Sequence, residues 1–134
     1  MSAASDYLEL KVLDHVLRYS ASPYTGVSTL YLGLFTADTG LEGNAPSAEV
    51  STSGTAYVRT AVTFAAAASG SSATNATVTY AAATANWGTV THVAVMDAST
   101  SGNVLFYGAV TTSKTIETGD TFQVSSGNLT VSLA

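Results

Sequence analysis

Apolar positions near the start of the chain recur with the period of an α-helix. They follow one another by three or four residues at Leu8, Val12, Val16 and Tyr19, with Leu13 and Leu17 widening the stripe. Asp6 and Glu9 have the spacing of a capping box, in which each side chain accepts a hydrogen bond from the other residue's backbone N–H. The pattern predicts an amphipathic helix over about residues 7–19, ended by Ser20, Ser22 and Pro23.

From about residue 28 onward the apolar positions alternate with a period of two. Leu30, Leu32 and Leu34 show this alternation, which is typical of a strand buried on at least one face. Similar patterns, separated by Gly, Ser, Asn and Asp, predict further strands over residues 57–64, 77–80, 90–96, 104–110, 111–116, 121–124 and 129–133. We therefore expect a mainly β fold over residues 1–134, a single-domain β-sandwich or jelly roll (about residues 28–134) with one short N-terminal helix across an edge or open end.

Two stretches lack these patterns and are predicted to be loops. Residues 65–72 are rich in Ala but end in Gly and Ser between predicted strands. Residues 37–56 are polar and too long for a plain hairpin connection. Because large apolar residues are scarce in this second stretch, we expect an arm that becomes ordered only on contact with a partner.

Composition narrows the possible functions. The chain has no Cys, so it can form neither a disulfide nor a thiolate metal site. Charged residues make up only 10% of the chain and its mean hydropathy is +0.28, yet no apolar run approaches the ~20 residues that span a bilayer. A surface with so few charges is poorly soluble, so we expect other subunits to cover part of it. We expect no membrane insertion.

The charges that are present argue against two further classes of function. The net charge is −5 and the four basic residues are scattered, whereas nucleic-acid binding needs clustered Lys and Arg, so no nucleic-acid partner is expected. Charged residues also interrupt the first fourteen positions, where a signal peptide would be apolar. We expect the protein to stay in the cytoplasm of the cell that makes it, or to leave as part of a particle.

No catalytic or metal-binding constellation is recognisable. His15 and His92 each lack a second ligand at the spacing of a helix or a strand. Asp97 precedes a Ser- and Gly-rich stretch, where its side chain is expected to close a turn. Trp87 is expected to plug one end of the sandwich with its N–H bonded to a carbonyl; the alternative is a sugar-stacking surface beside Tyr80 or Tyr107. We expect no enzyme activity, no metal and no cofactor.

Four residues are candidates for an interface. Arg59 lies on a strand with few other charges and must find a carboxylate, either on Glu49 or Asp97 of its own chain or on a neighbouring subunit. Leu8 and Val12 lie on the apolar stripe of the helix, which we expect to dock on a partner subunit as well as on its own sheet.

The order of several short segments resembles a family of small tailed-bacteriophage virion proteins. The segments run along most of the chain: Ser5–Glu9, Asp14–Arg18, Leu30–Thr36, Glu49–Val50, Gly54, Tyr57–Arg59, Ala61–Phe64, Trp87–Asp97, Gly102–Gly108, Gly119–Asp120 and Asn128–Leu133. The 37–56 stretch departs from the pattern, since Gly40–Pro46 stands in place of a more Gly-rich run. Members of the family are usually described as tail-fibre or capsid-decoration proteins.

The resemblance implies a structural part of a virus particle. The favoured prediction is a capsid decoration (cement) protein on the capsid surface, assembled in the bacterial cytoplasm and bound to the major capsid protein and to copies of itself, for example as a trimer. The alternative is a tail-fibre or tail-tip component that recognises a host-surface glycan or protein. Decoration is favoured at this point because a single short domain without a fibrous shaft has little reach.

Overall fold

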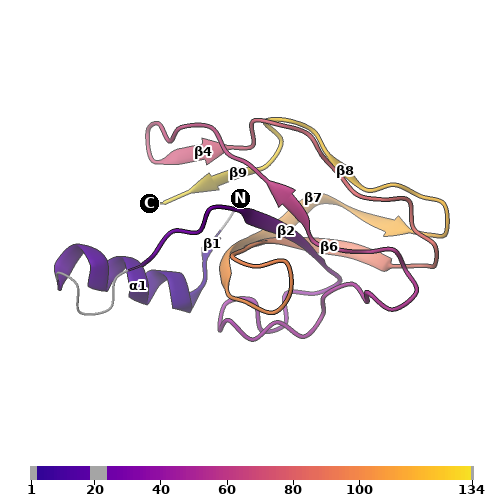
Figure 1. Ribbon diagram of the computed structural model, residues 1–134, viewed down its shortest axis with the longest axis horizontal. Coiled ribbons are helices and arrows are strands. Elements are labelled where there is room, and N and C mark those ends of the chain that lie inside the picture. The colour runs from indigo at the N-terminus through magenta and orange to yellow at the C-terminus, as the bar shows by residue number, and fades with distance from the viewer. Residues whose placement is uncertain (1–2, 19–23, 134) are drawn as a thin grey trace.

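The main sheet of the protein contains five antiparallel strands (Figure 1). The computed structural model describes residues 3–18 and 24–133, which form a mainly β, sandwich-like fold with one N-terminal helix, so the predicted fold class is confirmed. In spatial order the strands are β1 (Ala3–Ala4), β7 (Val104–Ile116), β6 (Gly88–Met96), β2 (Leu30–Phe35) and β3 (Thr60–Val62).

Two short strand pairs cover one face of this sheet. They are β4 (Ser71–Ala73) with β9 (Thr130–Ser132), and β5 (Val78–Thr79) with β8 (Gln123–Val124). Alternate residues of β2 and β6 face this layer, and Leu32, Leu34 and Val95 form one core with Val78 and Phe122. The predicted strands over residues 30–36, 77–80, 90–96, 121–124 and 129–133 are therefore confirmed, with shorter limits for most of them.

The 37–56 segment covers the opposite face of the sheet. Leu41 is fully buried there in a second cluster with Phe35, Met96 and Val104. The same segment bonds to the end of β2, since the Thr36 N–H donates to the carbonyl of Ala48 at 2.9 Å. The prediction of an arm that orders only on contact was wrong, because Leu41 on this face and Val50 in the main core anchor the segment to its own sheet.

The helix α1 (Asp6–Leu17) leaves the body at its N-terminal end and extends to one side (Figure 1). Its N-cap is Ser5, whose side chain accepts a hydrogen bond from the Leu8 N–H at 3.3 Å and donates one to the Val104 carbonyl. The predicted capping box of Asp6 and Glu9 was wrong, because β1 fixes Ser5 beside β7 and makes it the cap.

The predicted end signals of the helix and Tyr19 lie outside the described residues. No helix in residues 3–18 or 24–133 is long and apolar enough to cross a membrane.

The bounds of three predicted segments differ from those in the structure. The two strands predicted over residues 104–110 and 111–116 form one strand, β7. Its pairing with β6 shifts in register between the pairs Val90–Lys114 and His92–Ala109, and the extra residues of β7 form a bulge there. The predicted 57–64 strand is paired only over β3, with an isolated bridge at Phe64. The predicted 65–72 loop instead turns at Gly70, with a φ of +77°, into β4.

Candidate functional site

A buried ion pair ties together the loops at one end of the sandwich. The guanidinium of Arg59 binds the Glu49 carboxylate with two hydrogen bonds, from Nε at 2.7 Å and from Nη2 at 3.0 Å. The Tyr57 hydroxyl donates to the same carboxylate at 2.9 Å and accepts from the Leu34 N–H at 3.0 Å. Arg59, just before β3, thus joins the 37–56 segment to the sheet.

The same guanidinium holds the turn that connects β6 to β7. Its Nη1 donates to the carbonyl of Ala98 at 2.9 Å and to that of Ser101 at 2.7 Å. Only 7% of the Arg59 side chain is exposed. Burial disfavours its charge, but the bonds and charge of Glu49 outweigh this effect and raise the pKa of Arg59. The two predicted interface residues therefore contact each other, and the prediction of Glu49 as a partner of Arg59 within the chain is confirmed.

A second polar network braces the same turn. The Asp97 carboxylate accepts hydrogen bonds from the backbone N–H and the side-chain amide of Asn103, at 2.6 and 2.8 Å, which confirms its predicted role in a turn. The side chain of Asn44 bonds to the Asn103 side chain and to the Val104 N–H, at 2.9 and 2.7 Å. A Cβ on Gly102 would lie 2.5 Å from Asp97 Oδ1, so the turn requires glycine there. We call residues 38–50 and 97–103 the loop end.

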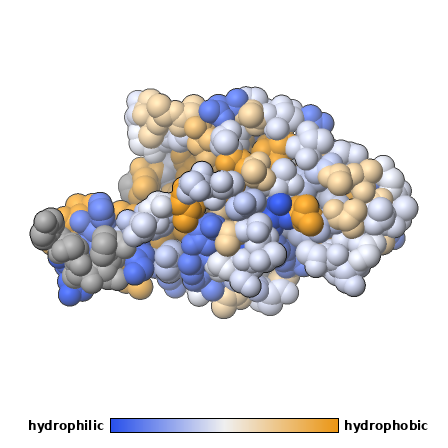
Figure 2. Space-filling model, in the orientation of Figure 1, coloured by the Kyte–Doolittle hydropathy of each residue, from blue (hydrophilic) through white to orange (hydrophobic). Residues whose placement is uncertain are grey.

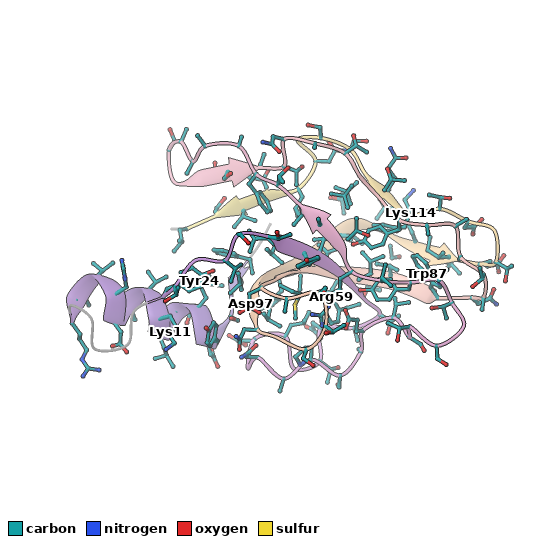
Figure 3. The ribbon with its side chains drawn as sticks, in the orientation of Figure 1. Lys11, Tyr24, Arg59, Trp87, Asp97 and Lys114 are labelled. Atoms are coloured by element: carbon teal, nitrogen blue, oxygen red, sulfur yellow. The ribbon has the colours of Figure 1, made fainter. Side chains whose placement is uncertain are left out.

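Trp87 lies in an aromatic cluster of the main core, beside Tyr57. Its indole N–H donates to the Thr55 carbonyl at 2.8 Å, and its ring meets Tyr57 and Tyr80 edge-on at centroid distances of 5.4 and 6.2 Å. Figure 3 shows Arg59 between Asp97 and Trp87 in this view. Trp87 is only 5% exposed, so the prediction of a plug is confirmed and the sugar-stacking alternative is wrong.

The histidines are not brought together with other ligand residues. His92 Nδ1 shares a hydrogen bond with the Thr91 hydroxyl at 2.8 Å, and His15 is exposed on α1. In the part of the chain that the structure describes, no three His, Asp or Glu side chains are placed to hold a metal ion.

An open apolar groove lies between α1 and the β4–β9 pair. Its volume is about 500 Å³, and Leu8 and Val12 line it from the helix while Phe64, Phe106 and Leu133 line it from the body. Figure 2 shows hydrophobic surface gathered in the recess where the helix leaves the body. Leu8 is buried and Val12 half-buried in this position, so the structure places these two predicted interface residues against the body.

The helix also carries a second apolar stripe, which is largely exposed. We call it the outer stripe: Leu10 is 66% exposed, Leu13 54% and Leu17 73%. At 100° per residue these three lie on the side of α1 opposite Leu8. The prediction that Leu13 and Leu17 widen the Leu8 stripe was wrong, and Leu10 was missed. The signal was the spacing of three and then four residues between these leucines, which defines a seam of its own.

Carboxylates gather where the outer stripe begins. The Asp6 N–H donates to the Glu42 carbonyl at 2.9 Å, which brings the first turn of α1 beside the 37–56 segment. Burial and then four nearby carboxylates raise the pKa of the Tyr107 phenol; the carboxylates are those of Glu42, Asp6, Glu9 and Asp38. At the other end of α1, Arg18 pairs with Asp14 at 3.2 Å. One end of the outer stripe is thus acidic, and the other carries the exposed Arg18–Asp14 pair.

Comparison with known proteins finds one family. The model of the family described as Podophage GP4 fiber I protein gp80 matches residues 3–132. No curated protein matches the chain. The family match spans both the loop end and the helix, so it describes the whole of the fold given above.

Proposed function

The chain belongs to the podophage GP4 fiber I protein gp80 family, a family of phage virion proteins, and on this basis we propose that it is a structural subunit of a tail fibre. The observation that carries the proposal is the family match over residues 3–132. A subunit of this kind works by binding its neighbours in the particle, so we propose a structural role and no catalysis.

The distribution of apolar surface supports a subunit that is covered by neighbours. Among the described residues every buried side-chain nitrogen and oxygen has a hydrogen-bond partner, so the body is complete by itself. By contrast, four of the large apolar residues that remain exposed lie within one short helix: Leu10, Leu13, Val16 and Leu17. Such a patch on a protein with few charges marks a contact surface.

A capsid decoration protein, which the sequence favoured, is now the second candidate. Both roles need a small domain that binds other virion proteins, and the family description supports the first because it names a fibre. The earlier objection was that a short domain has little reach. That objection loses weight if the chain is one of several kinds of subunit along a fibre, because reach then comes from the assembly.

Labelling of intact particles separates the two candidates. Purified virions would be incubated with a gold-labelled antibody against this protein and viewed by negative-stain electron microscopy, with an antibody against the major capsid protein as the control. We expect gold on the tail for the first antibody and over the shell for the second. Gold spread over the shell with both antibodies would refute the fibre proposal and favour decoration.

Particles that lack the protein give a second readout. We expect them to keep the heat resistance of normal shells but to adsorb poorly to cells, with adsorption restored when the purified protein is added back. Particles that adsorb normally and break at a lower temperature would show instead that the protein stabilises the shell.

A further inference from the structure

The outer stripe of α1 has the spacing of a helix-pairing seam. Leu10, Leu13 and Leu17 follow one another by three and then four residues, which is the a–d–a pattern of a two-stranded coiled coil. All three are more than half exposed, whereas Leu8 on the opposite side is buried against the body. The helix thus has two apolar sides, and its own chain covers only one of them.

The charges along α1 decide how a second helix can lie on this stripe. The start of the stripe is acidic, through Asp6, Glu9 and Glu42, while Arg18, which pairs with Asp14 on the surface, follows its end. A parallel copy would place the two acidic ends side by side and align the two helix dipoles. An antiparallel copy would instead place Arg18 of each helix at the acidic end of the other and oppose the dipoles.

Two antiparallel registers place leucine opposite leucine, and the one that pairs Leu10 with Leu13 also overlaps the whole of α1. In such pairs a and d positions face each other, so Leu10 of one helix meets Leu13 of the other. In this register the two-fold axis passes between Lys11 and Val12, at the midpoint of α1. The whole of Asp6–Leu17 in one copy therefore lies beside Asp6–Leu17 in the other. Leu17 then lies opposite Asp6 of the second copy, and Arg18 reaches the level of its Ser5, near Asp6 and Glu42.

We propose that the outer stripe binds the outer stripe of a second copy of this chain, as an antiparallel helix pair around a two-fold axis. The groove between α1 and the β4–β9 pair stays outside this contact. The pair is self-complementary, as a two-fold contact requires, since each helix supplies both the acidic end and Arg18. The inference does not depend on whether the protein sits on a tail or on a shell.

The contact is small and is therefore weak in dilute solution. Three leucines on a helix of about 18 Å bury far less than the ~1,600 Å² of a standard interface. The pair is expected to form at high protein concentration, and in a particle where the copies are held close together.

Sedimentation equilibrium of the purified protein tests the contact. The wild-type chain is expected to form a concentration-dependent dimer, and Leu13→Asp to lower the association constant at least roughly tenfold, since an interface carries most of its energy in a few central side chains. Val58→Asp is the matched control: Val58 is 62% exposed on the body, so the same change there leaves association unaltered. A wild-type chain that stays monomeric at ~1 mM, or equal effects of the two substitutions, would overturn the proposal.

Cysteine cross-linking tests the orientation, and the chain is suited to it because it has no Cys of its own. Leu10→Cys and Leu13→Cys proteins are mixed and oxidised. In the antiparallel register the mixed disulfide forms faster than either homodimer, because only Leu10 and Leu13 face each other at the Cα separation of about 5.5 Å that a disulfide needs. Faster homodimer formation would show a parallel pair and contradict the proposed arrangement.

Discussion

The loop end and α1 differ in whether their own chain satisfies their side chains. At the loop end, polar groups are buried and satisfied within the chain: Arg59 alone donates to Glu49, Ala98 and Ser101. Along α1, by contrast, the three leucines of the outer stripe stay exposed. The first region is finished without a partner, whereas the second gains stability only when something covers it.

Each region also contains an arginine–carboxylate pair, and the two pairs differ in the same way. Arg59 and Glu49 are joined by two bonds with the arginine almost fully buried. Arg18 and Asp14 are 3.2 Å apart on the surface of α1, where the arginine is 66% exposed. The comparison teaches that the buried pair belongs to the fold, while Arg18 is available to reach a neighbour.

High pH should have the largest effect on stability, through the buried tyrosines of the main core. Burial raises the pKa of the Tyr57 and Tyr80 phenols well above their ordinary value of 10.0. Both phenols therefore stay neutral in the folded state when those of the unfolded chain ionise, so their contribution is fully present below about pH 10 and is lost as the pH rises further. We expect the midpoint of thermal unfolding to be level up to about pH 9 and to fall steeply above about pH 10.

A Tyr80→Phe protein provides the control for this titration. It should be less stable at neutral pH, because the Tyr80 hydroxyl bonds to the Leu32 carbonyl, but should lose less stability between neutral and alkaline pH. An alkaline loss as steep as in the wild type would mean that Tyr80 does not drive it.

Removing the buried arginine should have the next largest effect. Arg59→Ala leaves the carbonyls of Ala98 and Ser101 without this donor and Glu49 with only the Tyr57 hydroxyl. It is expected to lower the free energy of unfolding by about 3 kcal/mol, measured by urea denaturation. Arg18→Ala is the matched variant at the other region and should cost less than about 0.5 kcal/mol, as exposed pairs do. Equal costs would remove the distinction between the two ion pairs.

A change on the outer stripe should have the smallest effect on the isolated chain. Leu13→Gln keeps a good helix former on an exposed position, so we expect the unfolding free energy of the monomer to change by less than about 0.5 kcal/mol in dilute solution. A loss of more than about 2 kcal/mol would show that Leu13 belongs to the core of its own chain after all.

Local patterns predicted much of this structure. Period-two alternation located β2 and β6, because a strand that packs on a core repeats its apolar residues on one face. The scarcity of charge predicted that Arg59 must find a carboxylate, with Glu49 as one of the alternatives, and the structure shows Glu49 as its partner. The size of the lone Trp87 predicted its burial with a bonded N–H. In these cases a single residue type has few physically acceptable surroundings.

The remaining features depend on tertiary contacts that no local pattern contains. Leu41 is one apolar residue in a polar stretch, and only the open face of β2 and β6 explains its burial. Asn44, with a φ of +57°, was not predicted either, since its partners Asn103 and Val104 are distant in sequence. For α1, the sequence shows two apolar sides but not which of them the body covers.

Hydroxyl-radical footprinting of the intact particle tests most directly whether α1 is the association surface. The oxidation rates of side chains would be compared between the purified protein in dilute solution and the same protein in virions, by mass spectrometry of peptides. We predict that Leu10, Leu13 and Leu17 are protected in the particle, while residues of the 97–103 turn react at similar rates in both states. Unprotected leucines on α1 together with a protected loop end would contradict the account.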